Sequence, residues 1–357
     1  MDLEERIGLI QQVGEEIVTL EELRSLLETK KHPVAYDGFE PSGRMHIAQG
    51  LMRTINVNKM VKADVRFKMW VADWFAWMNN KMDGDLEKIR TTGKYFIEIW
   101  KACGMKTDKI DFIWAKDVVT KESHWKTTID IARHSTVSRI MRCSQIMGRK
   151  AGEDLSAAQI IYPCMQAADI FHLGCDIAQL GMDQRKVNML AREVGPKLGF
   201  WKPVVVSHHM LLGLEKPTTA STDKDDIMLD LKMSKSRPDS AIFMDDSEDE
   251  IKRKIAKAYC PEKQAELNPV LEYCKYLVFE QFKEMKIERP AKFGGNAEYD
   301  SYAGLEADFV AGKLHPMDLK NATAFYINRQ LEPVRKHFEK GSAKKLVEEV
   351  KSFTVTR

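Results

Sequence analysis

Apolar positions alternate between strand-like and helical spacing through the first two thirds of the chain. The first helical pattern, over 19–30, begins with the capping-box pair Thr19 and Glu22. Further helical patterns cover 47–61, 86–102 and 184–198, and apolar strand-like runs cover 34–36, 65–72, 110–115, 176–181 and 203–207. Strands separated by helical crossovers predict an α/β fold, with a parallel sheet covered by helices on both faces.

The pattern changes after Ser247, which forms a second capping box with Glu250. From there the spacing is helical almost throughout, over 251–258, 269–285, 302–311 and 317–338. We therefore predict three parts, which are N-terminal helices over 1–30, an α/β domain over 31–246 and an all-α domain over 247–357. Within the second part, the polar and acidic segment 215–230 predicts a mobile surface loop.

Composition narrows the class of protein. The chain has 357 residues, of which 44% are hydrophobic and 30% charged, as expected for a soluble protein of two domains. Its net charge of +2 excludes a polycation, so any nucleic acid must contact local basic patches. Six cysteines without a CxxC pair predict neither a disulfide framework nor a zinc site, and they favour a reducing, cytoplasmic location. The acidic N-terminus is not a signal peptide, and no apolar run is long enough to span a membrane.

Candidate phosphate-binding residues lie in two loops. The loop over 38–45 follows the first strand of the predicted sheet, where parallel sheets bind their ligands. Gly43 lets a phosphate approach the backbone, and His46, at the start of the next helix, can donate to phosphate oxygens. Lys232 and Lys235 supply cations from a second predicted loop. The chain contains neither GxxxxGKS/T nor GxGxxG, which argues against a P-loop and against a dinucleotide-binding fold.

Three polar residues share one face of a predicted helix. Tyr162, Gln166 and Asp169 stand at positions i, i+4 and i+7 of an otherwise apolar pattern. A buried aspartate and glutamine need hydrogen-bonding partners. Those partners are either a bound substrate or groups on neighbouring helices, and the spacing alone leaves both possibilities open.

Two short segments resemble the ATP-binding motifs of class I aminoacyl-tRNA synthetases. They are 41–49 (PSGRMHIAQ), which resembles the motif known as HIGH, and 232–236 (KMSKS). The first departs from the family pattern, because Ala48 and Gln49 stand where the family has glycine and histidine. The segments 36–43, 162–169 and 181–186 narrow the resemblance to tyrosyl-tRNA synthetases of the archaeal and eukaryotic cytosolic branch, over about 19–339. This resemblance implies a Rossmann-like catalytic domain followed by an all-α anticodon-binding domain.

The resemblance also implies roles for individual residues. Tyr36 and Asp169 would bond the phenolic hydroxyl of L-tyrosine, Asp73 would lie near the bound amino acid, and Phe75 replaces a histidine of several relatives. The α-ammonium group and backbone of tyrosine would be held by Tyr162, Gln166 and Gln184. ATP would contact Gly43, His46, Gln49, Lys232, Met233, Ser234, Lys235 and Ser236. Among these, His46, Lys232 and Lys235, with Mg²⁺ brought by ATP, would stabilise the departing pyrophosphate, and no protein-bound metal is expected.

The remaining implications concern RNA and assembly. Lys186 would contact the acceptor stem of tRNA(Tyr), and the anticodon would be read by Phe293, His315 and Asp318. Phe293 and His315 can stack on bases and Asp318 can accept from a guanine edge, but His315 could equally form a turn and Asp318 a helix N-terminal acid. Phosphates of the RNA could be contacted by Arg133, Arg139, Arg142, Arg149 and Lys150. Members of the family are homodimers, so we expect a homodimer.

Three alternatives remain from the sequence. A tryptophanyl-tRNA synthetase shares both ATP motifs, but an indole needs only one acceptor, so the Tyr36/Asp169 pair argues against it. A nucleotidyltransferase with a related histidine motif would leave the helical C-terminal region unexplained. A catalytically silent RNA-binding relative would have no need for both Lys232 and Lys235.

Overall fold

The computed structural model describes residues 1–147, 154–219, 224–235 and 237–353. Within these residues a six-stranded sheet has the order β1-β6-β5-β2-β3-β4. The strands are β1 (Glu16–Val18), β2 (Val34–Phe39), β3 (Arg66–Val71), β4 (Ile110–Trp114), β5 (Ile177–Ala178) and β6 (Val204–Ser207). The chain runs outward from β2 to β4 and then returns to β5 on the other side of β2. The C-terminal ends of β2 and β5 therefore flank the switch point, where open α/β sheets bind ligands.

The sheet is mixed rather than purely parallel. Strands β2 to β6 pair in parallel, as the spacing predicts, but β1 pairs antiparallel with β6, with Glu16 opposite Ser207. The sequence prediction missed β1 because the strand has three residues, all half-buried, and shows no alternation. The predicted N-terminal helices therefore enclose an edge strand of the central sheet.

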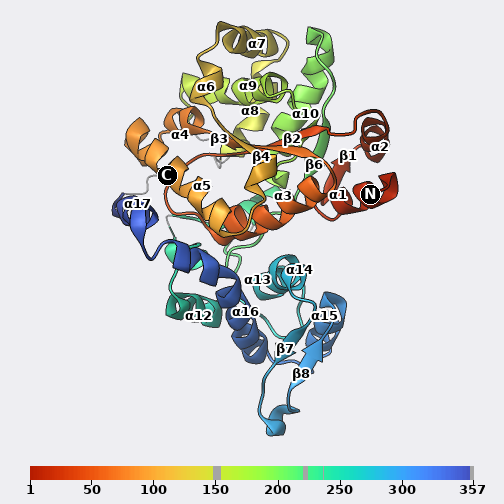
Figure 1. Ribbon diagram of the computed structural model, residues 1–357, viewed down its shortest axis with the longest axis vertical. Helices are drawn as coiled ribbons and strands as arrows, with labels where there is room; N and C mark the ends of the chain where they lie inside the picture. The colour runs from red at the N-terminus through yellow and green to blue at the C-terminus, as the bar shows by residue number, and fades with distance from the viewer. Residues whose placement is uncertain (148–153, 220–223, 236, 354–357) are drawn as a thin grey trace.

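Helices cover both faces of the sheet (Figure 1). Along β2, Ala35 belongs to the core on one face and Tyr36 to the core on the other, and Met69 and Trp70 of β3 divide in the same way. The first core is covered by α1 (Leu3–Gln11), α2 (Leu20–Thr29), α3 (Arg53–Lys62) and α5 (Leu86–Ala102). The second is covered by α4 (Asp73–Met78), α6 (Lys116–Val119), α7 (Glu122–Arg133), α8 (Val137–Cys143), α9 (Ala157–His172) and α10 (Arg185–Val194).

The predicted helix starts agree closely with the structure. Thr19 caps α2, and the side chain of Glu22 accepts in return from the Thr19 N–H, so the capping box is confirmed. Helix α5 has the predicted bounds and is capped by Asp85. One helix differs, because the helix predicted to begin at 47 starts with a π-helical turn over Ala48–Met52 before α3.

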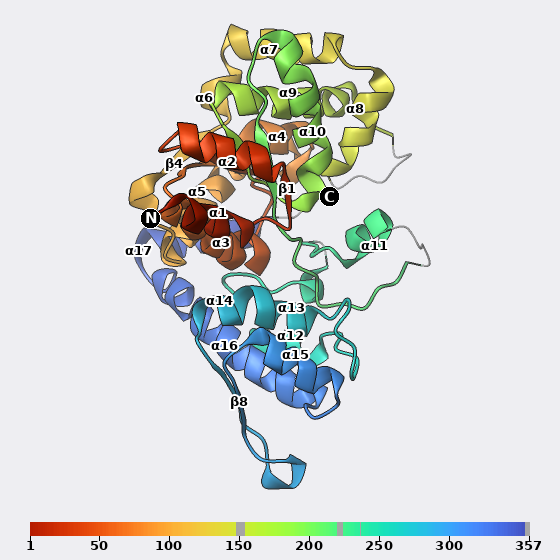
Figure 2. The same ribbon diagram turned by 90° about the vertical axis from the view of Figure 1, so that its right-hand side faces the viewer.

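The C-terminal region contains a hairpin that the all-α prediction missed. Strands β7 (Met285–Ile287) and β8 (Ala297–Tyr299) pair antiparallel and project from the end of the molecule (Figure 2). The helix predicted over 269–285 instead ends at Gln281, because buried Met285 and Ile287 flank exposed Lys286 with a strand period of two. The helices of this region are α12 (Glu248–Lys257), α13 (Pro269–Tyr273), α14 (Phe279–Gln281), α15 (Tyr302–Val310), α16 (Pro316–His337) and α17 (Gly341–Ser352).

The segment predicted to be a loop over 215–230 is partly helical. Helix α11 covers Lys224–Leu231, and the Asp230 carboxylate accepts from the Thr218 N–H and hydroxyl. Residues 220–223 lie outside the described residues. No helix in the described residues combines the length and apolar character needed to cross a membrane.

Candidate active site

A cavity of about 990 Å³ lies beyond the C-terminal ends of β2, β5 and β6. Strand β2 contributes Tyr36 to its wall, α9 contributes Tyr162, Gln166 and Asp169, and the segment after β6 contributes 208–211. The loop after α11 contributes 232–235. The helical spacing of the three α9 residues predicts one shared face, and all three line this cavity.

One part of the wall carries buried polar atoms without protein partners. Tyr36 Oη, Asp169 Oδ2 and Trp70 Nε1 are buried and make no hydrogen bond. Burial and the neighbouring Asp169 carboxylate raise the pKa of Tyr36 well above its usual range, so the phenol is neutral. Buried polar groups are almost always satisfied in folded proteins, so unsatisfied ones on a cavity wall indicate a polar ligand.

A histidine from a neighbouring helix fixes the Asp169 carboxylate. His124 of α7 is fully buried, and its Nε2 lies 2.8 Å from Asp169 Oδ1. Burial raises the pKa of Asp169 to about 6, although the bond from His124 lowers it in part. The carboxylate is therefore ionised at neutral pH, with one oxygen held by His124 and the other available to a ligand.

The neighbouring polar side chains already have partners. Tyr162 Oη donates to Glu40 Oε1 at 2.7 Å, and the Phe75 ring packs edge-on against the Tyr162 ring with centroids 4.8 Å apart. Gln166 Nε2 donates to Gln184 Oε1 at 3.0 Å, and Gln184 Nε2 donates to the carbonyl of Ile146. These bonds orient the two amides along the cavity wall.

Asp73 is not among the residues that line the cavity. It is fully buried, its Oδ1 accepts from the Lys116 N–H, and its Oδ2 accepts from Arg90 Nε at 3.2 Å. Its carboxylate joins the start of α4 to α5 and α6, and both of its oxygens have protein partners. Gly43 is not among the lining residues either, although Ser42 and His46 are, and its φ of 107° lies in a region that favours glycine.

His46 is half-buried and neutral. It forms a β-bridge with Phe243 and directly precedes the helix, as predicted, with its carbonyl accepting from the N–H groups of Gln49 and Gly50. Its Nδ1 has no hydrogen-bonding partner. Burial lowers the pKa of His46 well below its usual range, and the nearby Lys235 and Lys232 lower it further. A neutral imidazole keeps one N–H, which can donate a hydrogen bond to a ligand. Gln49 also lines the cavity, and its Oε1 is buried without a partner.

Two lysines enter the same cavity from the loop after α11. Lys232 Nζ donates to Asp183 Oδ2 at 2.7 Å, and the Asp183 charge raises the pKa of Lys232. Lys235 Nζ donates to Ser42 Oγ at 3.0 Å and lies 5.0 Å from the centre of the Phe96 ring. Burial, with a smaller effect of Lys81, lowers the pKa of Lys235 to about 7. Met233 and Ser234 also line the cavity, and Ser236 lies outside the described residues.

Comparison with known proteins identifies the family. Residues 28–332 match the family model described as tRNA synthetases class I (W and Y). The whole chain is 51% identical to tyrosine–tRNA ligase 1, cytoplasmic, of Arabidopsis thaliana and covers 90% of that protein. The crystal structure of tyrosyl-tRNA synthetase complexed with L-tyrosine from Pyrococcus horikoshii matches with a TM-score of 0.92 and 41% identity, over 99% of this chain and 100% of that one. The chain belongs to the class I tyrosyl-tRNA synthetases.

The synthetase contains cavity residues that sequence reasoning did not single out. Among them are Glu40, Lys81 and Asp183, and His124 lies behind Asp169. Glu40 and Asp183 stand inside segments that resemble the family, but no spacing links them to Tyr162 or Lys232. His124 is 45 residues from Asp169 in a helix without a motif, so its contact with Asp169 exists only in the folded chain.

The predicted RNA-contacting residues of this synthetase belong to α10, to the hairpin loop and to the start of α16. Lys186 lies in the first turn of α10, beside Gln184. His315 caps α16, where its Nδ1 accepts from the Met317 N–H at 3.1 Å, and Asp318 lies in the first turn. These are the capping roles left open above, and they leave the His315 side chain exposed. Phe293 belongs to a short turn within the hairpin loop.

The basic residues of the expected phosphate path are partly used within the protein. Arg139 pairs with Glu193, and Arg133 pairs with Asp130. Arg149 and Lys150 lie outside the described residues. The described part of this path therefore offers less unpaired positive charge than the sequence suggests.

Proposed function

We propose that the cavity joins L-tyrosine to ATP as tyrosyl-adenylate, and that the tyrosyl group then passes to the 3′ end of tRNA(Tyr). One observation carries the proposal. The same cavity holds the unbonded Tyr36 Oη and Asp169 Oδ2 and, from a loop, the cations Lys232 and Lys235. The chain belongs to a family of enzymes, and ligation of tyrosine to tRNA is its activity.

Tyrosine is recognised through its hydroxyl. Asp169 Oδ2 accepts a hydrogen bond from the phenolic O–H, and Tyr36 Oη donates one to the phenolic oxygen, so the ligand satisfies both buried groups. Phenylalanine would leave both unpaired, and each unpaired buried group costs roughly 1–3 kcal/mol. Tyr162, Gln166 and Gln184 hold the α-ammonium group and backbone of the substrate.

The carboxylate of bound tyrosine is the nucleophile. One of its oxygens bonds to the α-phosphorus of ATP while the bond from that phosphorus to the pyrophosphate oxygen breaks, and the electron pair leaves with pyrophosphate. No protein base is needed, because the carboxylate is already ionised at neutral pH. Lys232 and Lys235 neutralise the charge that builds on the leaving phosphates, and His46 donates a hydrogen bond to them. Gln49, Met233, Ser234 and Ser236 complete the ATP contacts, and Mg²⁺ enters as part of the ATP substrate.

The adenylate then reacts with a ribose hydroxyl at the end of the tRNA, which forms the ester and releases AMP. Lys186 contacts the acceptor stem near the cavity. Phe293, His315 and Asp318 read the anticodon by stacking and by hydrogen bonds to base edges. We also propose a homodimer and a cytoplasmic location, the latter in line with the name of the Arabidopsis relative.

Exchange of labelled pyrophosphate into ATP tests the activation step without RNA. We expect exchange that depends on tyrosine, with tryptophan and phenylalanine at least about 30-fold less effective in kcat/KM because each leaves buried polar groups unpaired. Exchange driven by tryptophan would contradict the roles of Tyr36 and Asp169. Absence of exchange from folded protein with Mg²⁺ and all three amino acids would contradict the proposed activation chemistry.

A further inference from the structure

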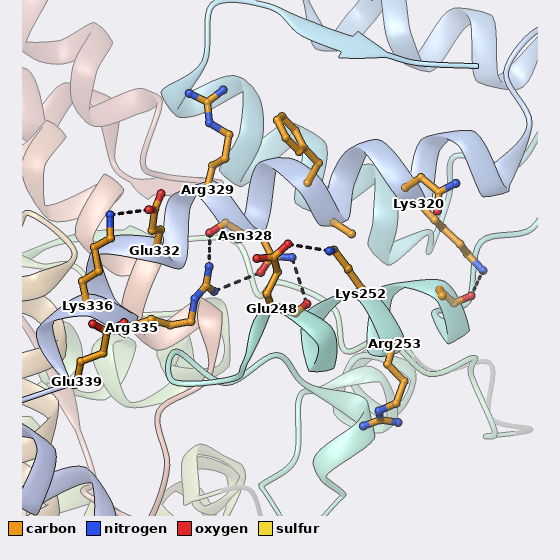
Figure 3. A pocket seen from close by; sticks show the side chains of 14 residues that line it. Glu248, Lys252, Arg253, Lys320, Asn328, Arg329, Glu332, Arg335, Lys336 and Glu339 are labelled. Carbon is orange, nitrogen blue, oxygen red and sulfur yellow. Dashed lines mark hydrogen bonds and ion pairs between the residues drawn. The ribbon is translucent and has the colours of Figure 1, made fainter. Parts of the chain in front are cut away.

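The C-terminal region has a groove of its own, with a volume of about 870 Å³, between α12 and α16 (Figure 3). Among the described residues, none lines both this groove and the catalytic cavity. The C-terminal region reaches the catalytic cavity through another helix, α13. There it contacts His209, a residue of the cavity wall that has no role in the activation chemistry above.

His209 lies between three separate segments of the chain. Its Nδ1 lies 3.2 Å from Glu15 Oε2, in the segment before β1, and its Nε2 lies 3.1 Å from Glu272 Oε2 of α13. Its ring stacks on the ring of Tyr276, in the π-helical turn that follows α13, with centroids 4.3 Å apart. A single side chain on the cavity wall therefore joins the N-terminal segment and the C-terminal region to the segment that follows β6.

His209 is charged at neutral pH and can bond both carboxylates at once. Although burial opposes the charged form, the bonds to Glu15 and Glu272 raise the pKa of His209 to about 9. Both ring nitrogens of a charged imidazole carry a proton, so each can donate to one carboxylate. The His209 and Glu272 side chains are 14% and 18% exposed, so solvent screens this pair less than an ion pair on the open surface.

Glu272 also holds the backbone of the cavity segment. Its Oε2 accepts from the Leu212 N–H at 3.0 Å. Leu212 in turn forms a β-bridge with Lys232, and the Gly213 N–H donates to the carbonyl of Leu231 at 2.7 Å. The backbone that Glu272 holds is therefore the backbone against which the loop carrying Lys232 is aligned.

The start of the same segment is held independently. The His208 N–H donates to the carbonyl of Leu180 at 2.9 Å, and the His208 carbonyl accepts from the Met182 N–H at 3.0 Å. These bonds join the segment to the short turn that ends at Gln184, one of the residues proposed to hold tyrosine. Loss of the contact with Glu272 should therefore displace the end of the segment next to the lysine loop and leave the end next to the tyrosine site in place.

We infer that His209 and Glu272 are positioning residues for the formation of tyrosyl-adenylate. The pair fixes the backbone at Leu212, and through this backbone it fixes the position of Lys232 relative to the leaving phosphates. The inference rests on the proposed function, which assigns Lys232 to the activation step. Because Glu272 belongs to α13, a step that needs no RNA then depends on a residue of the C-terminal region.

Rapid-mixing measurement of adenylate formation at saturating ATP, without RNA, tests the inference. Glu272→Gln keeps the size of the side chain but removes the charge that holds His209. It should lower the rate constant about 3- to 100-fold, since misplacing a reacting group by about 1 Å can cost on the order of 10²-fold. The Kd for tyrosine should change less than about twofold. A loss of rate below about threefold, or a weakening of tyrosine binding that equals the loss of rate, would overturn the inference.

A double-mutant cycle separates positioning from a direct contact between His209 and ATP. His209→Gln alone should lower the rate about as much as Glu272→Gln, and the double variant should lose little more than either, because both changes break the same pair. A direct contact of His209 with ATP would instead make the two losses multiply, and this outcome would overturn the inference.

A second histidine–glutamate pair provides the matched control. His337 Nε2 of α16 lies 2.9 Å from Glu98 Oε2 of α5, so this pair also joins the C-terminal region to the α/β domain. His337→Gln and Glu98→Gln should leave the rate within about twofold of the native value. A loss equal to that of Glu272→Gln would mean that any weakening between the two regions slows the reaction, and it would overturn the inference.

Two further measurements keep the result interpretable. Thermal unfolding of each variant identifies loss of folding, and Glu272→Asp, which keeps the charge but shortens the side chain, replaces Glu272→Gln if that variant does not fold. Adenylate formation by the native protein tests the proposed function separately. Its absence would overturn the proposed function and the inference together, whereas an active native protein with unaffected Glu272 variants would overturn the inference alone.

Discussion

The two ends of the catalytic cavity are built in different ways. Around Tyr36 and Asp169 the wall consists of a strand and packed helices, and Tyr36 Oη and Asp169 Oδ2 are buried there without partners. Around Lys232 and Lys235 the wall consists of loops, and each cation already bonds a protein group, Asp183 or Ser42. The two unpaired oxygens are costly until a specific ligand fills the site, whereas the two lysines are satisfied until a stronger anion displaces their protein partners.

The difference matches the two tasks of the cavity. Choosing one amino acid requires fixed groups whose unmet hydrogen bonds penalise the wrong ligand. When the bond to the α-phosphorus breaks, negative charge increases on the leaving pyrophosphate. Stabilising it requires positive charge that can adjust its position to those phosphates. Changes at the amino-acid end should therefore alter binding and selectivity, and changes at the phosphate end should alter rate.

The largest effect is expected at the phosphate end. Replacing Lys235 by Ala removes a cation that opposes charge on the leaving pyrophosphate, so the rate of adenylate formation should fall about 10²–10³-fold. The KM for tyrosine should change little. Rapid-mixing measurement of adenylate formation checks this, with Lys88→Ala as a control on the surface of α5. A loss of less than about threefold would place Lys235 outside the chemistry.

Asp169 gives the corresponding change at the amino-acid end. Asp169→Asn keeps the shape of the side chain but removes the negative charge of the group that accepts a hydrogen bond from the phenolic O–H. The KM for tyrosine should rise about 30-fold, from a loss of ~2 kcal/mol for a hydrogen bond to a charged group, with a smaller change in kcat. Steady-state pyrophosphate exchange measures both constants, and Asp130→Asn on the exposed side of α7 is the matched control. A fall in kcat at constant KM would contradict the division between the two ends.

The pH dependence of tyrosine binding follows from the same carboxylate. Because the pKa of Asp169 is about 6 in the free protein, the carboxylate is mostly ionised at pH 7 and about nine-tenths protonated at pH 5. Protonation removes the acceptor, so the Kd for tyrosine should rise about 10-fold between pH 7 and pH 5. Equilibrium dialysis with labelled tyrosine checks this, and the rise should be absent in Asp169→Asn. A Kd that is the same at both pH values would refute the assigned role of Asp169.

The smallest effect concerns proton uptake at the phosphate end. The pKa of Lys235 is about 7 in the free protein, so at pH 8 about nine-tenths of this side chain is neutral. The phosphates of ATP favour the charged form, so binding should take up as much as about 0.9 proton per site. Calorimetry of ATP binding in buffers with different ionisation enthalpies measures the uptake. An equal uptake in Lys235→Met would assign the proton to another group.

Parts of this arrangement were predictable from sequence, namely those set by local spacing. The alternation of strands and helices, the capping box at Thr19 and the common face of Tyr162, Gln166 and Asp169 depend on neighbours a few residues apart. The edge strand over 16–18 and the hairpin over 285–299 were missed, because short strands depend on a partner elsewhere in the chain.

Long-range contacts account for the remaining differences. The bond of His124 to Asp169 and that of Lys235 to Ser42 join elements 45 and 193 residues apart, and no local pattern marks either pair. The same limit applies to Asp73, whose carboxylate is used by Arg90 and the Lys116 N–H. A sequence can identify an aspartate near a strand end, but it does not show which distant groups form hydrogen bonds with that aspartate in the folded chain.

The most direct test of the account is the selectivity between tyrosine and phenylalanine. The ratio of kcat/KM for the two amino acids in pyrophosphate exchange should be measured for the native protein and for Tyr36→Phe. If the buried hydroxyl of Tyr36 reads the phenolic oxygen, the variant should lose about 10-fold or more of the ratio, through weaker use of tyrosine, while its use of phenylalanine stays the same or improves. An unchanged ratio in a folded variant would contradict the central claim that unsatisfied groups at this end of the cavity select the amino acid.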